Sequence, residues 1–135
     1  MPPIKFFLDT HILIWWLEGL SGLTAGQRQV LDQFDLHRPF GVSDITLAEI
    51  GCLHAGGRIS LSGELGDWLA RATAEPLVKL CRITPTVVSE ISRLPDTMPR
   101  DPSDRIIVAT ARVHGATLLT RDRRILASGA LPTLY

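Results

Sequence analysis

The chain has 135 residues, 45% of them apolar, and this length and composition are typical of one compact domain with a real core. Lys and Arg together number 14, as do Asp and Glu, so no overall positive field attracts a polyanion. The balance excludes general electrostatic attraction to nucleic acid, which would have to be bound by a local surface.

Lys5, Asp9 and His11 interrupt the apolar N-terminal stretch, which argues against a signal peptide or a membrane span and predicts a cytoplasmic protein. Cys52 and Cys81 lie in apolar segments and lack the spacing of a disulfide framework or a metal site. We interpret both as small buried side chains in a reducing compartment.

Short apolar runs alternate with helical patterns from the start of the chain. Residues 4–8 form an apolar and aromatic run, typical of a strand buried on both faces, and Asp9 follows at its carboxyl end. Residues 10–17 are apolar on nearly all sides, which predicts a short buried helix. Thr24 and Gln27 have the spacing of a capping box, so a second helix is expected to begin there.

The same alternation continues to the end of the chain. Residues 40–42 predict a strand, and Ser43 can cap the helix that follows. The later predicted elements are a helix at 64–74, a strand at 78–83, a helix that starts at Thr84 and Pro85, a loop at 95–102, a helix that ends at Gly115 and a strand at 116–120. Strands that alternate with helices, without an internal repeat, predict an α/β fold with a mainly parallel sheet.

Four acidic residues lie just after predicted strands or near the starts of predicted helices. Asp9 and Asp122 follow the first and last predicted strands, and Asp104 and Glu49 lie in the first two turns of their helices. In open α/β sheets ligands bind beyond the carboxyl ends of the strands, where the next helices begin. Four carboxylates from distant parts of the sequence are therefore expected at one edge of the sheet.

Gathering these charges is unfavourable, because two carboxylates about 5 Å apart repel by roughly 3 kcal/mol at an effective dielectric constant of about 20. An all-oxygen set without a His or Cys cluster is what a hard cation such as Mg²⁺ prefers, although shared protonation is another way to offset the charge. A metal ion there can bind a phosphate oxygen and activate water, which indicates metal-assisted phosphodiester hydrolysis.

Each acidic residue also has a purely structural interpretation. Asp104 is suited to the first turn of a helix capped by Asp101, Glu49 to a solvated helix position, and Asp122 to a turn with surface ion pairs. Asp9 is harder to explain in this way, since it lies in an apolar run where an unpaired carboxylate is costly. The hypothesis of a shared site rests on the coincidence of all four.

Four ordered motifs carry a family resemblance: Leu-Asp-Thr-His at 8–11, Leu-Ala-Glu-Ile at 47–50, Arg-Asp-Pro-Ser-Asp-Arg-Ile-Ile-Val-Ala-Thr-Ala at 100–111 and Leu-Leu-Thr-Arg-Asp at 118–122. With them the chain resembles PIN-domain nucleases, and more narrowly the VapC-type toxins of toxin–antitoxin pairs. The match spans nearly the whole chain. It departs from many relatives at Leu47, where they have Trp, and over residues 59–82, which bears on the choice of substrate and partner.

The resemblance implies a single PIN domain over residues 1–135, with a three-layer α/β/α fold around a central, mainly parallel sheet. It implies an endoribonuclease toxin that depends on Mg²⁺ or Mn²⁺. Its further implications are an RNA substrate, a cognate antitoxin that covers the acidic site, and a homodimer. The catalytic and metal-binding residues implied are Asp9, Glu49, Asp104 and Asp122.

The resemblance also places hydroxyl groups near the acids. Thr10 and Thr120 match positions where the family has hydroxyls that orient a carboxylate or a water, although Thr10 also suits a helix start. Asp101 matches a further frequent acid, but capping is enough to explain it.

Other residues near the motifs are not assigned to the predicted site. The arginines that flank Asp104 and Asp122 suit RNA phosphates, and equally an ordinary charged surface. Trp15 and Trp16 fit either a partner-binding patch or the core, and core packing is expected for at least one of them. His11 and the other three histidines are interpreted as structural.

Two other functional classes remain as alternatives. A Mg²⁺-dependent phosphatase or phosphotransferase could use Asp9 as a nucleophile, but its usual signature has a second Asp two residues later, where this chain has His11. A non-catalytic PIN-like module that binds RNA or protein is the other alternative, and four intact acidic positions argue against it.

Overall fold

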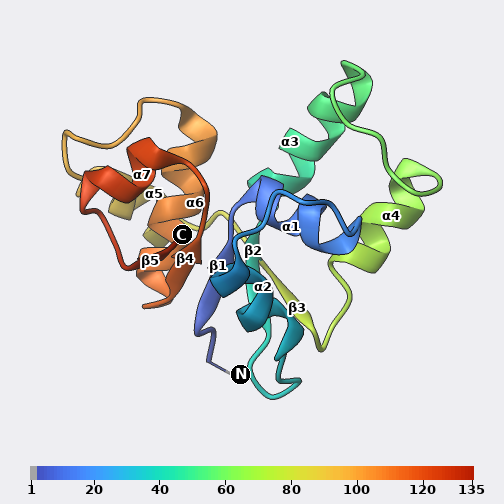
Figure 1. Cartoon of the computed structure of the whole chain (residues 1–135). Coiled ribbons are helices and arrows are strands. Elements are labelled where there is room, and N and C mark those ends of the chain that lie inside the picture. Colours follow the sequence, from blue (N-terminus) through green and yellow to red (C-terminus); the bar gives the residue numbers. More distant parts are fainter. Residues whose placement is uncertain (1–2) are drawn as a thin grey trace.

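The computed structural model describes residues 3–135, and Figure 1 shows its course. A five-stranded sheet with the strand order β3-β2-β1-β4-β5 forms the centre, and each of its neighbouring strand pairs is parallel. Its strands are β1 (Phe6–Leu8), β2 (Phe40–Ser43), β3 (Val78–Cys81), β4 (Thr117–Leu119) and β5 (Thr133–Leu134). The predicted parallel sheet is confirmed.

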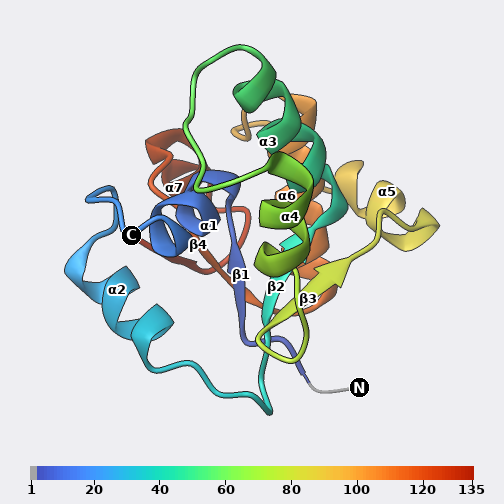
Figure 2. The ribbon, with the colours of Figure 1, turned by 90° about the vertical axis from the view of Figure 1, so that its right-hand side faces the viewer.

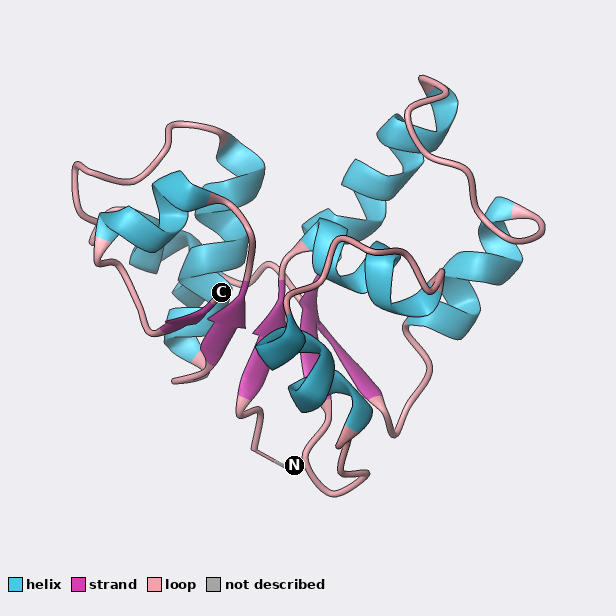
Figure 3. Ribbon diagram, in the orientation of Figure 1, coloured by secondary structure: helices cyan, strands magenta, loops and turns pink. Residues whose placement is uncertain are grey.

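Helices cover both faces of this sheet and complete three layers (Figures 1 and 3). The helices are α1 (Thr10–Leu17), α2 (Ala25–Asp32), α3 (Asp44–Ala55), α4 (Leu65–Ala72), α5 (Pro85–Ile91), α6 (Pro102–Val113) and α7 (Arg123–Ser128). Helices α1, α2 and α4 pack on one face of the sheet, and α5, α6 and α7 lie on the other. Figure 2 shows α3 rising beyond the carboxyl end of the sheet, where β1 leads into α1.

The side chains of the central strands pack into two apolar cores, one on each face of the sheet. Phe7 and Leu118 belong to the core beneath α6, whereas their neighbours Leu8 and Leu119 belong to the core beneath α1 and α2. Successive side chains of a strand point to opposite faces of the sheet, so both faces of β1 and β4 need apolar residues. This is why the strands are continuous apolar runs rather than alternating ones.

Side-chain caps set the points where the helices begin. The predicted capping box is present, because the Thr24 hydroxyl accepts from the backbone N–H of Gln27 at 3.1 Å while the Gln27 side chain accepts from the Thr24 N–H at 3.1 Å. Gln27 is fully buried, and its Nε2 donates to the carbonyl oxygens of Thr120 and Leu134, each at 2.9 Å. The start of α2 is therefore bonded directly to the ends of β4 and β5.

The structure departs from the prediction in three places. Helix α7 and strand β5 were not anticipated, because they are only six and two residues long and show no usable periodicity. Cys81 is buried as predicted, but the same prediction for Cys52 is wrong, since its side chain is exposed. Helix α3 buries Thr46 and Ile50, whereas Cys52 lies on an exposed face of the helix.

None of the helices in residues 3–135 has the length and apolar character that crossing a membrane requires.

Candidate active site

A cleft of about 520 Å³ lies at the carboxyl end of the central strands, and we call it the acidic cleft. It is lined by Asp9, Thr10, His11, Ile12, Trp15, Glu49, Arg58, Asp101, Asp104, Arg121, Asp122 and Arg124. All four acidic positions singled out from the sequence are among them, together with Asp101. The parallel topology explains this convergence, because β1, β4 and the starts of α3 and α6 meet at one edge of the sheet.

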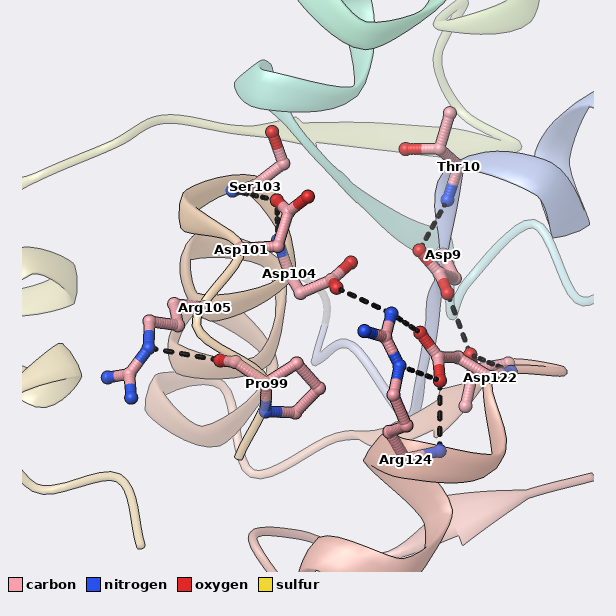
Figure 4. A network of polar contacts seen from close by, with 10 residues as sticks. Asp9, Thr10, Pro99, Asp101, Ser103, Asp104, Arg105, Asp122 and Arg124 are labelled. Atoms are coloured by element: carbon pink, nitrogen blue, oxygen red, sulfur yellow. Dashed lines mark hydrogen bonds and ion pairs between the residues drawn. The ribbon is translucent and has the colours of Figure 1, made fainter. Parts of the chain in front are cut away.

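Asp9 ends β1 and caps α1. Its Oδ1 accepts from the backbone N–H of Thr10 at 2.9 Å, and its Oδ2 accepts from the Thr120 hydroxyl at 2.7 Å (Figure 4). Burial raises the pKa of Asp9 above its usual value, although these two hydrogen bonds act in the opposite direction. The carboxylate is thus fixed in orientation by two donors that carry no formal charge, a backbone N–H and a hydroxyl.

Glu49 is fixed in the same way from the second turn of α3. Its Oε1 accepts from the Thr10 hydroxyl at 2.5 Å, and the same hydroxyl lies 2.9 Å from that of Thr46, which is fully buried. Burial, and then the charges of Asp9 and Asp101, raise the pKa of Glu49. The expectation that Thr10 and Thr120 orient carboxylates is confirmed.

Asp101 and Asp104 begin α6 and have different roles. Oδ1 of Asp101 accepts from the backbone N–H groups of Ser103 at 2.8 Å and Asp104 at 3.3 Å, so its predicted capping role is confirmed. The Asp104 side chain faces the cleft instead and is 17% exposed. Burial first, and then the charges of Asp9, Asp101, Asp122 and Glu49, raise the pKa of Asp104 from 3.8 to about 7.

Asp122 caps α7 and forms an ion pair with Arg124. Its Oδ1 accepts from the Arg124 backbone N–H at 2.9 Å and from Nε at 3.2 Å, and its Oδ2 accepts from Nη2 at 3.0 Å. These hydrogen bonds lower the pKa of Asp122. The structural interpretation of Asp122 thus holds for these contacts, yet Nη2 also lies 3.8 Å from Oδ2 of Asp104, which links the pair to the cleft.

The donor chemistry of the acidic cleft suits a hard divalent cation, because its ligand candidates are carboxylate and hydroxyl oxygens. Across residues 3–135 no three His, Cys, Asp or Glu side chains are arranged closely enough to form a finished metal cage. Mg²⁺ does not need one, since it binds through one or two carboxylates and keeps several waters. Burial first, and then the neighbouring acids, raise the pKa of Asp104, and a bound cation would act in the opposite direction.

Basic and aromatic side chains complete the wall of the cleft. Nη1 of Arg121 donates to the Gly22 carbonyl at 2.6 Å, and its Nη2 donates to the Tyr135 hydroxyl at 3.2 Å. Arg58 lies after α3, and the sequence offers no local signal that it reaches the cleft. His11, interpreted as structural, lies on the cleft wall with its ring 5.5 Å from that of Trp15.

Both tryptophans also pack against the core. Trp15 and Trp16 are half-buried against the residues beneath α1 and α2, and Trp16 meets Phe40 edge-on at 5.4 Å. The prediction of core packing for at least one of them is confirmed.

Comparison with known proteins identifies the family of this chain. The family model described as PIN domain matches residues 6–130. The chain is 34% identical over 118 residues to Ribonuclease VapC22 of Mycobacterium tuberculosis, a match that covers 87% of each protein.

Solved structures share the fold at low sequence identity. VapBC2 from Rickettsia felis bound to a promoter DNA fragment superposes with a TM-score of 0.70 at 14% identity, covering 97% of this chain and 98% of that one. DNA-bound VapBC from Salmonella typhimurium gives 0.69 at 19% identity, covering 97% of each chain. The α/β/α architecture and the resemblance found in the sequence motifs are confirmed, and the chain belongs to the PIN-domain family.

Proposed function

We propose that the chain is a divalent-metal-dependent endoribonuclease of the VapC type, with Asp9, Glu49, Asp104 and Asp122 as its catalytic, metal-binding residues. The observation that carries the proposal is the convergence of these four carboxylates in one cleft despite their mutual repulsion. Similarity to a protein named as a ribonuclease supports the choice of RNA as substrate.

Mg²⁺, or Mn²⁺ in its place, would supply Lewis-acid activation of a phosphodiester and of the attacking water. Asp9, Asp104 and Asp122 present carboxylate oxygens toward the cleft where such an ion would be held, and Glu49 completes the negative wall. The hydroxyls of Thr10 and Thr120 hold Glu49 and Asp9 in fixed orientations, so little reorganisation is needed when a cation arrives.

The rim of the cleft provides the local positive charge that a neutral chain needs to hold RNA. Arg58 and Arg121 line the cleft beside the acids, and a guanidinium can bind a phosphate with two parallel hydrogen bonds. The Arg121 side chain is anchored by the Gly22 carbonyl and the Tyr135 hydroxyl, which limits the conformational freedom that it loses on binding.

Cleavage of structured RNA by the purified chain tests the activity. We expect cleavage with Mg²⁺ or Mn²⁺, none with EDTA, and none by Asp9→Asn or Asp104→Asn. The matched control is Asp32→Asn, an exposed acid at the end of α2, which should cleave normally. Activity that survives EDTA, or that persists in both site variants, contradicts the proposal. Turnover of p-nitrophenyl phosphate without RNA cleavage would instead favour the phosphatase alternative.

A protein partner forms the second part of the proposal. Solved structures that share this fold include a toxin–antitoxin complex from Klebsiella pneumoniae, with a TM-score of 0.65 at 20% identity. We expect the chain to be a cytoplasmic toxin that forms a homodimer and is inhibited by a cognate antitoxin covering the acidic cleft. Induced expression should stop growth, and co-expression of the antitoxin should restore it. Expression of Asp9→Asn should be harmless, and light scattering should give the mass of a dimer.

A further inference from the structure

Arg124 places its guanidinium between two of the carboxylates that the proposed function assigns to a metal ion. Its Nη2 lies 3.0 Å from Oδ2 of Asp122 and 3.8 Å from Oδ2 of Asp104, and Nε lies 3.2 Å from Oδ1 of Asp122 (Figure 4). The side chain therefore bridges acids that come from two different helices, α6 and α7.

The exposure of the Arg124 side chain indicates that its ion pairs with Asp104 and Asp122 can break easily. The Arg124 side chain is 69% exposed, while those of Asp104 and Asp122 are only 17% and 23% exposed. Ion pairs made by an exposed, flexible arginine contribute little net stability, because water screens them and ordering the side chain costs entropy. No hydrogen bond holds Nη1 of Arg124 within residues 3–135, so only one edge of the guanidinium is held.

We propose that Arg124 is an exchangeable internal counter-ion, which offsets part of the negative charge of Asp122 and Asp104 in the metal-free protein and leaves them when a divalent cation binds. The inference rests on the proposed function and adds a residue that controls metal affinity. A divalent cation on these carboxylate oxygens would lie within a few ångströms of the guanidinium charge, and the two cations repel and compete for the same lone pairs. Binding therefore requires Arg124 to rotate away, a motion that its exposure permits.

Metal titration of the full chain by calorimetry, with Mn²⁺ as the probe, tests this competition. Removal of the bridging guanidinium in Arg124→Gln should tighten Mn²⁺ binding by about 10-fold, equivalent to about 1.4 kcal/mol. The matched control is Arg123→Gln, which removes the same charge from the neighbouring residue. The Arg123 side chain donates to the Tyr135 hydroxyl and not to the acids of the cleft. The control should change the affinity by less than about two-fold, because its charge is farther from the cleft and screened by water.

Three outcomes overturn the inference. Unchanged affinity in Arg124→Gln shows that the arginine does not compete. An equal gain in Arg123→Gln shows a general effect of charge rather than exchange at these oxygens. Absence of any Asp104-dependent Mn²⁺ binding in the unaltered chain refutes the proposed metal site itself, and this inference falls with it.

A second measurement observes the exchange in the unaltered protein. The Nε–H group of Arg124, assigned with the help of Arg124→Gln, can be followed by nitrogen-15 NMR during titration with Mg²⁺. We expect its signal to move to the position of a free arginine, or to be lost to rapid solvent exchange, as the ion binds. A signal that keeps its bound position at saturating Mg²⁺ overturns the inference, even if the metal binds.

Discussion

The two sides of the acidic cleft hold their carboxylates by different means. Asp9 and Glu49, on the side of β1 and α3, accept hydrogen bonds from the neutral hydroxyls of Thr120 and Thr10. Asp104 and Asp122, on the side of α6 and α7, face the cationic Arg124.

The two kinds of partner have different effects on a carboxylate: a hydroxyl orients it, whereas a guanidinium also offsets its charge. A hydroxyl fixes the direction of a carboxylate but leaves its charge, and burial accordingly raises the pKa of both Asp9 and Glu49. A guanidinium cancels charge, and hydrogen bonds from Arg124 lower the pKa of Asp122. Asp104 is farther from the guanidinium, so burial and the surrounding acids still raise its pKa to about 7. The carboxylates of Asp9 and Glu49 are thus held in place by neutral groups, whereas the charge of Asp122 and part of that of Asp104 are offset by an exposed side chain.

The largest effect is expected from a substitution of Asp9, on the side of the cleft formed by β1 and α3. Asp9→Asn keeps the size of the side chain but removes the charge of the most central acid, so RNA cleavage should fall on the order of 100-fold or more. Initial rates at saturating Mg²⁺ measure this, with Asp32→Asn as the control. A loss of less than about three-fold would show that the cleft works without its central carboxylate.

A smaller effect should follow from removing only the hydroxyl that orients the Asp9 carboxylate. Thr120→Val keeps the shape of a fully buried side chain but loses the hydroxyl that donates to Asp9 and accepts from the Asp122 N–H at 3.1 Å. Activity or metal affinity should fall by about 10–100-fold, as is usual for groups that orient ligands.

The matched variant Thr120→Ser retains the hydroxyl and should recover most of the activity. Equal losses in both variants would indicate damaged packing rather than lost orientation. Thermal unfolding of both variants distinguishes these cases.

A third prediction concerns the energetic cost of crowding the acids. Because the folded state raises the pKa of Asp104 from 3.8 to about 7, it binds this proton more readily than the unfolded chain does. Stability from this group is therefore present in acid and is lost as pH rises through about 7. Asp104→Asn should stabilise the metal-free protein above neutral pH by about 1–2 kcal/mol, or several degrees in melting temperature.

The gain should shrink as pH falls and approach zero below about pH 3, where Asp104 is protonated in both the folded and the unfolded state. Thermal unfolding in EDTA at several pH values measures this, and adding Mg²⁺ should favour the unaltered protein instead. A variant that is less stable than the unaltered protein at every pH would contradict the idea that burial and the neighbouring acids make the ionised form of Asp104 unfavourable.

The smallest effect is expected for Asp101, which lines the cleft but whose hydrogen bonds are those of a helix cap. Asp101→Ala should therefore lower the free energy of unfolding by about 1 kcal/mol and change cleavage only modestly. Asp101→Asn retains a capping oxygen and should restore the stability, as chemical denaturation would show. A loss of cleavage in Asp101→Asn as large as in Asp9→Asn would make Asp101 a fifth member of the site.

Local patterns were enough for much of the fold. Thr24 with Gln27, Ser43, and Thr84 with Pro85 identified helix starts, because caps depend on residues close in sequence. Helix α7 and strand β5 escaped detection because they are too short to show a period, and their stability comes from packing against α6 and β4. The exposure of Cys52 was also not predicted, since the sequence of an apolar helix does not show which of its faces will be covered.

Sequence patterns alone predict the order of strands and helices up to β4, the positions of the four acids after strands or in early helix turns, and the membership of a family. These follow from periodicity, capping and motif spacing, which are local properties. The pair of Asp122 with Arg124 is local, and a turn with surface ion pairs is what the sequence suggests there. Three of the carboxylates have partners that the folded structure alone reveals: a threonine hydroxyl for Asp9 and for Glu49, and the Arg124 guanidinium for Asp104. The reason is that such pairings join groups as far apart as Asp9 and Thr120, and only the packing of parallel strands and their helices brings those groups within bonding distance.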